Sequence, residues 1–274
     1  ITTILTYLGS LIIHDPKGEL YCVTQRERRE SGSKVQLLDP FGKVKALWKS
    51  GKAPNLTEEQ ATSLQFNPLA IISIDDESCL ADVAKIYKAI CPKNTDKEED
   101  FFEIQAKSYL NAVTLYLIEC RDRGIECEFP ATLPGVRDFF SQNTARLMEH
   151  VDRMIESPVK GIKNPGQNMK DTYADGEGET VWLSILGTVS SFTGLLLDDE
   201  RVRRFLSGHT CEVHTLRNKP STVYYVQPPK EIIQGITEAR LLYSDVIGWI
   251  QTPHHSMESE PTLKENVLFV MDEF

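Results

Sequence analysis

Short apolar runs alternate with helical stretches near both ends of the chain, and a long segment of helical periodicity separates the two regions. Residues 11–13 and 35–38 predict two buried strands with a helix between them, and 222–226 and 267–271 predict two more. Over 75–208 the apolar residues recur at helical spacing without a convincing strand. Strand–helix–strand patterns with short loops are typical of parallel sheets. We therefore expect an α/β fold with a mostly parallel sheet and an inserted all-α domain.

These patterns divide the chain into three expected segments. Residues 1–72 form the first part of the sheet domain, 73–208 form the inserted all-α domain, and 209–274 form the second part of the sheet domain. Within the insert, 98–121 is apolar almost all round, which is typical of a helix at the centre of a bundle. Gly, Pro, Asn, Lys and Asp are frequent in 157–178, and this composition predicts a mobile loop.

The composition is ordinary for a globular protein but has an acidic balance. A net charge of −10 and a pI near 5.2 exclude a protein coated with basic surface for nucleic acid, though not a small basic lining in an assembled pore. The cysteines include no Cys-x-x-Cys pair, which favours free thiols in a reducing compartment and hence the cytoplasm. No apolar run approaches the ~20 residues that span a bilayer, and no secretory signal opens the chain. Both ends look like cuts through structured regions.

The residues that most suggest chemistry are acids directly after predicted strands. Residues 267–271 are followed by Asp272 and Glu273, and the first strand is followed by 15–19, Asp-Pro-Lys-Gly-Glu. An open α/β sheet forms its ligand crevice at the carboxyl ends of its strands. There an Asp can hold Mg²⁺ through water and a Glu can polarise an attacking water. Two simpler interpretations stay open: a solvated acid that ends a buried strand, and a Pro-Lys-Gly turn selected for its geometry.

Segments along nearly the whole chain match one known family in the same order. They are 10–20 (SLIIHDPKGEL), 35–42 (VQLLDPFG), 66–69 (FNPL), the helix that opens with Phe101, Phe102 and Ala106, 221–229, and 267–274. In this ordered combination the chain resembles the TraG-type coupling proteins of type IV secretion and conjugation. Phe66 is a departure, because that family usually has Trp there.

The resemblance implies a RecA-like motor with an inserted all-α domain. Such proteins form ring-shaped homo-hexamers at the cytoplasmic face of the bacterial inner membrane, attached by N-terminal helices that would lie upstream of this chain. Using ATP and Mg²⁺, they pass DNA–relaxase complexes or protein effectors to the type IV secretion channel. The implied partners are therefore a relaxosome or effectors, channel proteins and DNA.

The resemblance also implies roles for individual residues. Asp272 would be the Mg²⁺-coordinating acid of the Walker B strand, and Glu273 the catalytic carboxylate. Asp15, Lys17 and Glu19 lie in a family motif that should face the nucleotide or the next subunit, with a role that the motif itself does not define. The two sheet segments would be the two parts of a nucleotide-binding domain.

The family's phosphate-binding loop, G-x-x-x-x-G-K-[ST], is absent from this chain. Gly51 and Lys52 are followed by Ala53 rather than Ser or Thr. Position 46 is Ala where the motif requires Gly. The loop should lie upstream of Ile1. We therefore expect this chain alone to be mostly monomeric, not to hydrolyse ATP, and to have no tightly bound cofactor.

Two other functions remain open at this stage. The chain could act as a recruitment module whose helices bind cargo or accessory proteins without ATPase activity. The chain could also belong to a chromosome-type DNA pump of the FtsK or HerA kind. Such a pump also has a catalytic acid directly after a buried strand, but is not expected to have this long helical insert. Binding of ATP by the chain would favour the motor, and cargo binding alone would favour the module.

Two weaker candidates remain. His209, Cys211 and His214 could be metal ligands, but no fourth ligand stands at a suitable spacing and an ordinary loop is favoured. A loose basic cluster could touch DNA or a partner, although solvated or ion-paired helix charges are favoured: it consists of Arg201, Arg203, Arg204, Arg217 and Lys219.

Overall fold

The protein folds as two compact units. The structure, a computed structural model, describes the following residues: 1–91, 100–174, 178–212, 216, 219–226 and 266–272. Residues 1–66 and 208–274 belong to one unit, here the sheet unit, and 67–207 form the other, the helical unit. The two compact units change over after residues 66 and 207. The domain boundaries that we expect from the sequence, after residues 72 and 208, stay predictions.

The sheet unit contains four parallel strands within its described residues, in the order β2-β3-β1-β4. The strands are β1 (Ser10–His14), β2 (Lys34–Leu38), β3 (Ser221–Tyr225) and β4 (Val267–Met271). Apolar runs of this length are typical of parallel strands buried on both faces. The prediction of an α/β fold with a mostly parallel sheet is confirmed. The strand β3, which follows the helical insert in sequence, lies between β1 and β2.

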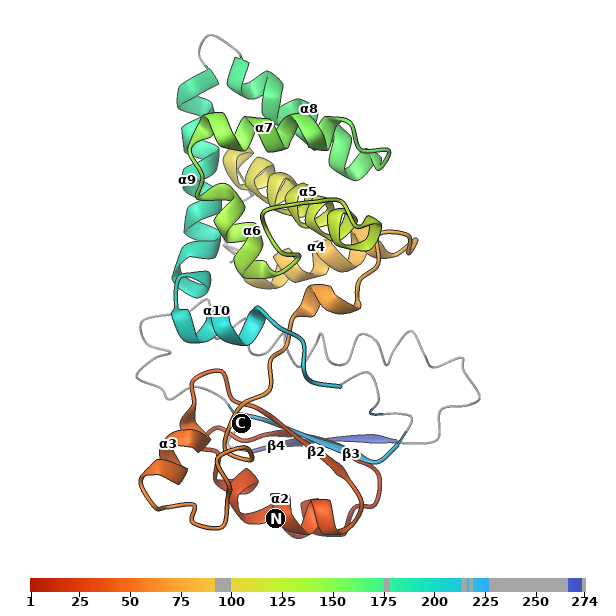
Figure 1. The fold of residues 1–274 in the computed structure, drawn as a ribbon, viewed down its shortest axis with the longest axis vertical. Coiled ribbons are helices and arrows are strands. Elements are labelled where there is room, and N and C mark those ends of the chain that lie inside the picture. Colours follow the sequence, from red (N-terminus) through yellow and green to blue (C-terminus); the bar gives the residue numbers. More distant parts are fainter. Residues whose placement is uncertain (92–99, 175–177, 213–215, 217–218, 227–265, 273–274) are drawn as a thin grey trace. The chain divides into compact units, whose positions relative to one another are not determined.

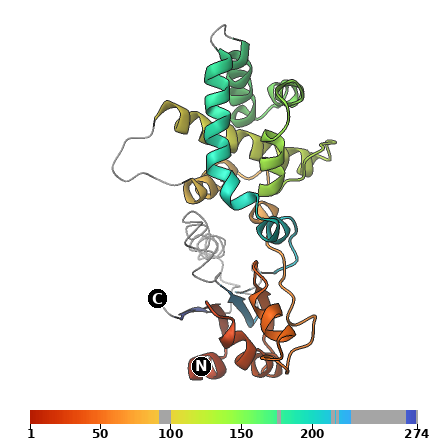
Figure 2. The same cartoon turned by 90° about the vertical axis from the view of Figure 1, so that its left-hand side faces the viewer.

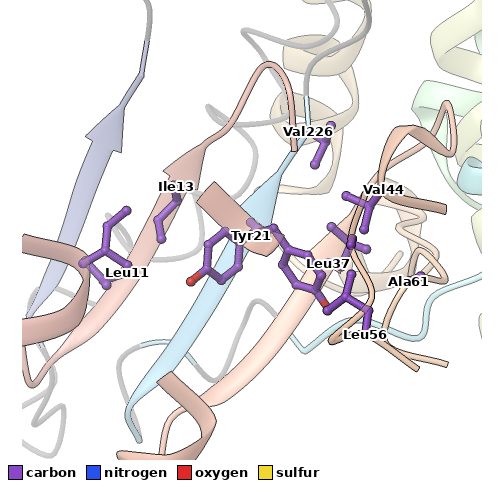
Figure 3. Close-up of a cluster of buried hydrophobic side chains, with 11 residues drawn as sticks. Leu11, Ile13, Tyr21, Leu37, Val44, Leu56, Ala61 and Val226 are labelled. Atoms are coloured by element: carbon purple, nitrogen blue, oxygen red, sulfur yellow. The ribbon is translucent and has the colours of Figure 1, made fainter. Parts of the chain in front are cut away.

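Helices of the N-terminal segment cover one face of this sheet (Figure 1). They are α1 (Thr2–Thr6), α2 (Glu19–Glu30) and α3 (Lys43–Lys49). Leu11 and Ile13 of β1 point to the same face because strand side chains alternate with a period of two. They pack in one apolar cluster with Tyr21 of α2 and Val44 of α3 (Figure 3). This cluster fixes α2 and α3 against the sheet, and with them the loops that lead into both helices.

Arg28 of α2 is a buried cation that ties the helix to its neighbours. It is 1% exposed. Its Nε donates to Thr222 Oγ1 at 2.9 Å, and its Nη2 donates to the Gly9 carbonyl at 3.0 Å. Burial lowers the pKa of Arg28, and the oxygen acceptors offset the loss of water around the guanidinium.

The helical unit is a bundle around α5. Its elements are a short 3₁₀ helix (Pro68–Ile71), α4 (Cys79–Ile90), α5 (Phe101–Arg123), α6 (Leu133–Phe140), α7 (Thr144–Ile155), α8 (Lys160–Ala174), α9 (Gly178–Leu197) and α10 (Glu200–Leu206). Helices α4, α6, α8 and α9 all contact α5, and Figure 2 shows α9 running along this bundle. The central position predicted for the helix over 98–121 is confirmed. It begins with a capping box between Asp100 and Glu103.

The predicted mobile loop over 157–178 is wrong, because most of this segment forms α8. The helix Lys160–Ala174 contains Pro165 in its interior. Its buried face repeats at helical spacing and consists of Ile162, Gly166 and Met169. Gly166 allows close packing on α7, since a Cβ there would lie 3.2 Å from the Cβ of Met154. Burial of this face outweighs the low helix propensity of Gly, Pro and Asn.

Candidate functional site

Three aspartates follow strands at the carboxyl edge of the sheet. Asp15 follows β1, Asp39 follows β2 and Asp272 follows β4. The parallel pairing of β1 with β4 continues beyond the strands, because the Asp272 N–H donates to the His14 carbonyl at 3.2 Å. The Asp15 N–H donates to the Tyr225 carbonyl at 2.9 Å. Asp15 and Asp272 therefore lie at the same edge, as the sequence predicts.

Asp15 is fully buried and closes the N-terminus of α2. Its Oδ2 accepts a hydrogen bond from the Tyr21 N–H at 2.8 Å, one of the N–H groups that have no partner inside the helix. Its Oδ1 has no hydrogen-bond partner within the described residues. Burial raises the pKa of Asp15; the N–H groups at the helix start oppose this rise, and the charge of Asp272 adds to it.

Asp39 closes the N-terminus of α3 in the way that Asp15 closes the N-terminus of α2. It is 2% exposed, and its Oδ2 accepts from the Val44 N–H at 2.7 Å. Its own N–H donates to Ser63 Oγ at 2.8 Å. Burial raises the pKa of Asp39, the N–H groups of the first turn oppose the rise, and the charge of Asp15 adds to it. In the part of the chain that the structure describes, its Oδ1 also lacks a hydrogen-bond partner.

The two loops share the sequence Asp-Pro-x-Gly and one backbone shape. Gly18 and Gly42 precede α2 and α3 with φ of 73° and 68°, a left-handed conformation that favours glycine. The first loop also packs against α3, since a Cβ on Gly18 would lie 2.9 Å from Cγ2 of Val44. Only the first of these loops is among the site residues that the sequence predicts. The repeated tetrapeptide is the signal that identifies Asp39 as the counterpart of Asp15.

The other expected site residues differ in exposure. Lys17 is exposed in the first loop, and Glu19 is exposed as the first residue of α2. Asp272 is partly exposed, whereas Glu273 lies outside the described residues. His14, which no sequence pattern singles out, is 8% exposed at the end of β1. Its Nδ1 is buried without a hydrogen-bond partner among the residues described here.

Within the described residues, the aspartates of this edge differ in what they leave available to a ligand. Mg²⁺ prefers carboxylate and water oxygens, and Asp272 is the partly exposed carboxylate of the three. A helix N-terminus binds phosphate through free N–H groups and its dipole. At α2 the Tyr21 N–H already donates to Asp15, and at α3 the Val44 N–H already donates to Asp39. Among the described residues of the edge, Asp272 is therefore the carboxylate that an ion could reach, and the expected Mg²⁺ and nucleotide sites stay predictions.

Comparison with known proteins identifies the family. The whole chain, residues 1–274, matches the family described as type IV secretory system conjugative DNA transfer. The chain belongs to that family. Protein VirD4 of Agrobacterium fabrum is 25% identical over 276 residues, and Protein VirD4 of Rhizobium rhizogenes is 26% identical over 276 residues. The resemblance to coupling proteins of type IV secretion is thus confirmed.

The relatives are much longer than this family member. The matches cover 100% of the chain but 36% of either VirD4 protein. The solved structure of the bacterial conjugative coupling protein TrwBdeltaN70 aligns with 97% of this chain and 56% of its own, at 12% identity and a TM-score of 0.46, which is too low to support an argument. In the described part of this coupling-protein chain, no helix has the length and apolar character to cross a bilayer.

Among the described residues, no group of three or more His, Cys, Asp or Glu side chains could hold a metal ion. His209 Nδ1 lies 4.0 Å from Cys211 Sγ. His214 falls outside the described residues.

Acidic neighbours pair with part of the basic cluster. Arg201 forms an ion pair with Asp199 at 2.6 Å, and Arg203 forms one with Asp138 at 2.7 Å. The pairing favours the interpretation of these arginines as ordinary helix-surface charges; Arg217 is outside the described residues.

A cavity of about 1050 Å³ lies in the helical unit, between the end of α5 and α7. Its lining includes His150 and the following charged residues: Glu119, Arg123, Glu126, Glu128, Arg146, Glu149, Arg153 and Glu156. Arg123 pairs with Glu119 at 2.5 Å and Arg146 pairs with Glu128 at 2.8 Å. A cavity of this size and polarity suits a charged segment of another protein better than an apolar ligand.

Proposed function

We propose that this chain supplies the acidic part of an ATP site in a type IV secretion coupling protein. In this proposal Asp272 holds Mg²⁺ through water and Glu273 polarises the attacking water. The supporting observation is the parallel pairing of β1 with β4, which aligns the strand before Asp272 with the strand before Asp15. Bound Mg²⁺ would neutralise charge on the transferred phosphoryl group.

The proposal divides the work among the residues at the edge. Asp272, partly exposed, is available to solvent and to an ion. Asp15 and Asp39 would have a structural role, because their Oδ2 atoms accept hydrogen bonds that fix the starts of α2 and α3. Lys17 and Glu19, both exposed, would face the nucleotide or a neighbouring subunit.

In the whole protein, segments other than these 274 residues would supply the rest of the ATP site. A phosphate-binding loop, membrane helices and further catalytic residues would lie in the parts of the longer relatives that the chain does not cover. The assembled protein would be a homo-hexamer at the cytoplasmic face of the bacterial inner membrane. It would use ATP to pass DNA–relaxase complexes or effectors to the secretion channel.

Two substitutions in the full-length protein test the assignment. Glu273→Gln should reduce ATP turnover by ~100-fold or more while largely sparing nucleotide binding, because a polarised water is needed only for chemistry. Asp272→Ala should weaken binding of Mg-ATP itself. Binding and steady-state hydrolysis are measured for each variant. Hydrolysis near the parental rate in Glu273→Gln would remove Glu273 from the catalytic role.

A second function, cargo recruitment by the helical unit, is favoured by the cavity of about 1050 Å³. Arg146→Glu would reverse a charge on its lining, whereas Lys170→Glu would reverse a charge in the exposed pair with Asp152 at 2.7 Å, away from the lining. We expect the first variant to lower transfer at unchanged ATPase activity and the second to leave transfer intact. Equal transfer by both variants would exclude the cavity as a recruitment site.

A further inference from the structure

A tight turn after α5 brings two cysteines together in the helical unit. Gly124 ends the helix with φ of 63°, and the Ile125 N–H donates back to the Cys120 carbonyl at 2.9 Å. The chain therefore reverses, and Cys127 returns to the last turn of α5. Cys120 and Cys127 consequently line the same cavity, of about 360 Å³.

The two thiols differ in access. Cys120 is 3% exposed, while Cys127 is partly exposed. Both line a cavity of about 360 Å³, and Cys127 also lines the larger cavity of about 1050 Å³ together with Arg153. A small solute can thus approach Cys127 from the larger cavity, with Cys120 behind it.

The charges around the pair favour one proton arrangement. The Cys120 thiol, the Phe129 N–H and the charge of Arg153 lower the pKa of Cys127, while burial and Glu128 oppose this effect. The interaction with Cys127 and burial raise the pKa of Cys120. Of the two thiols, Cys127 is therefore the one that loses its proton more readily. Thiolates, not thiols, are the nucleophiles in cysteine chemistry.

Two other cysteines have a raised pKa, in contrast to the lowered pKa of Cys127. Burial, with nearby acids, raises the pKa of Cys22 and of Cys79 to about 11. Both are therefore protonated near neutral pH and serve as internal references for an unreactive thiol.

We propose that Cys127 and Cys120 form a reversible dithiol site that a small hydroperoxide oxidises from the larger cavity. The Cys127 thiolate attacks one peroxide oxygen, the O–O bond breaks, and Cys127 becomes a sulfenic acid as hydroxide or alkoxide leaves and takes up a proton. The Cys120 sulfur then attacks the sulfenic sulfur. A disulfide forms, and the sulfenic oxygen leaves as water with the Cys120 proton. A dithiol reductant reverses the bond by thiol–disulfide exchange.

Site-resolved alkylation of the unmodified full-length protein tests the nucleophile. Iodoacetamide at neutral pH should modify Cys127 at least ~10-fold faster than Cys22 or Cys79, because its thiolate fraction is larger. Peptide mass spectrometry after timed quenching gives each rate. A rate for Cys127 equal to that of Cys22 would overturn the proposal.

Oxidation by hydrogen peroxide tests the pairing in the same protein. We expect a Cys120–Cys127 cross-linked peptide that dithiothreitol removes. Cys120→Ser should instead accumulate a dimedone-reactive sulfenic acid at Cys127, and Cys127→Ser should leave Cys120 reduced. Cys79→Ser is the matched control and should behave like the unchanged protein. Pairing of Cys127 with any other cysteine, or an unoxidised Cys127 at full oxidant dose, would contradict the proposal.

Discussion

At the scale of single residues, two buried aspartates determine the shape of the sheet edge. Asp15 and Asp39 each accept a hydrogen bond from a helix N–H through a carboxylate oxygen. The backbone hydrogen bonds between the strands continue up to these residues. A carboxylate at a helix N-terminus is favoured by the helix dipole, but moving it out of water into the protein interior is costly. The rise in the pKa of both groups shows that burial is the larger effect.

The pKa of Asp39 gives a pH-dependent prediction. Because folding raises this pKa, the contribution of the group to stability is fully present below the unfolded value of ~3.9 and is lost as the pH rises through the folded-state pKa. Asp39→Asn removes the titration but keeps an oxygen acceptor for the Val44 N–H. We expect the free energy of unfolding of the variant, relative to the unchanged chain, to improve as the pH rises from about 4 to about 7.

Asp39→Ala serves as the control for the capping bond. It also removes the charge, but it leaves the Val44 N–H without its acceptor, so it should be ~1 kcal/mol less stable than Asp39→Asn at neutral pH. Urea unfolding at several pH values measures both variants. An Asp39→Asn variant with the same pH slope as the unchanged chain would contradict the raised pKa.

The packing of the Gly18 loop against α3 gives a second residue-scale prediction. Gly18→Ala introduces a Cβ at positive φ and also places it 2.9 Å from Val44 Cγ2. Gly42→Ala has a similar φ but nothing within 4 Å of the new Cβ, so it reports backbone strain alone. Strain should cost ~1 kcal/mol in both, and the clash should add ~1 kcal/mol or more to Gly18→Ala. Equal losses in urea unfolding would show that the Gly18 loop does not pack against Val44 of α3 as described.

The sequence could place Asp15 and Asp272 at one edge, because the carboxyl ends of parallel strands share an edge whatever their order. It could not show that Asp15 is buried and used as a helix cap, since that depends on packing of α2 onto the sheet. The role of Asp39 could have been predicted together with that of Asp15, because both residues begin an Asp-Pro-x-Gly sequence after a predicted strand.

At the scale of elements, periodicity succeeds for α5 and fails for α8. Helix α5 has an apolar surface almost all round and is buried at the centre of the bundle. In α8 three small or apolar residues face the bundle, and the Gly, Pro and Asn residues around them obscure the pattern. The segment is helical because neighbouring helices bury that face, which is information that a single-sequence composition argument lacks.

Substitutions on the two faces of α8 test this explanation. Ile162→Ala removes a side chain that is fully buried and should lower the free energy of unfolding by ~2–4 kcal/mol. Lys163→Ala, on the exposed face of the same turn, should change it by less than ~0.5 kcal/mol. Chemical denaturation followed by circular dichroism gives both values. A small loss for Ile162→Ala would restore the loop interpretation.

At the scale of the whole molecule, the α/β class and the helical insert follow from sequence, whereas the strand order does not. The order β2-β3-β1-β4 places β3 beside β1 although more than half of the chain separates them. Pairing between such distant segments is decided by packing rather than by local pattern. The family match extends over 1–274, and the chain spans 36% of the length of the VirD4 relatives, so the two units correspond to a minor part of those proteins.

Calorimetric titration of this chain with Mg-ATP tests most directly whether it holds only the acidic part of the site. The chain has no phosphate-binding loop, and Asp15 and Asp39 occupy N–H groups at the starts of α2 and α3. The acids at the edge and the net charge of −10 repel a triphosphate. We predict no saturable binding at micromolar nucleotide. A low-micromolar dissociation constant that is lost in Asp272→Ala would reveal a phosphate site within this chain and contradict the account.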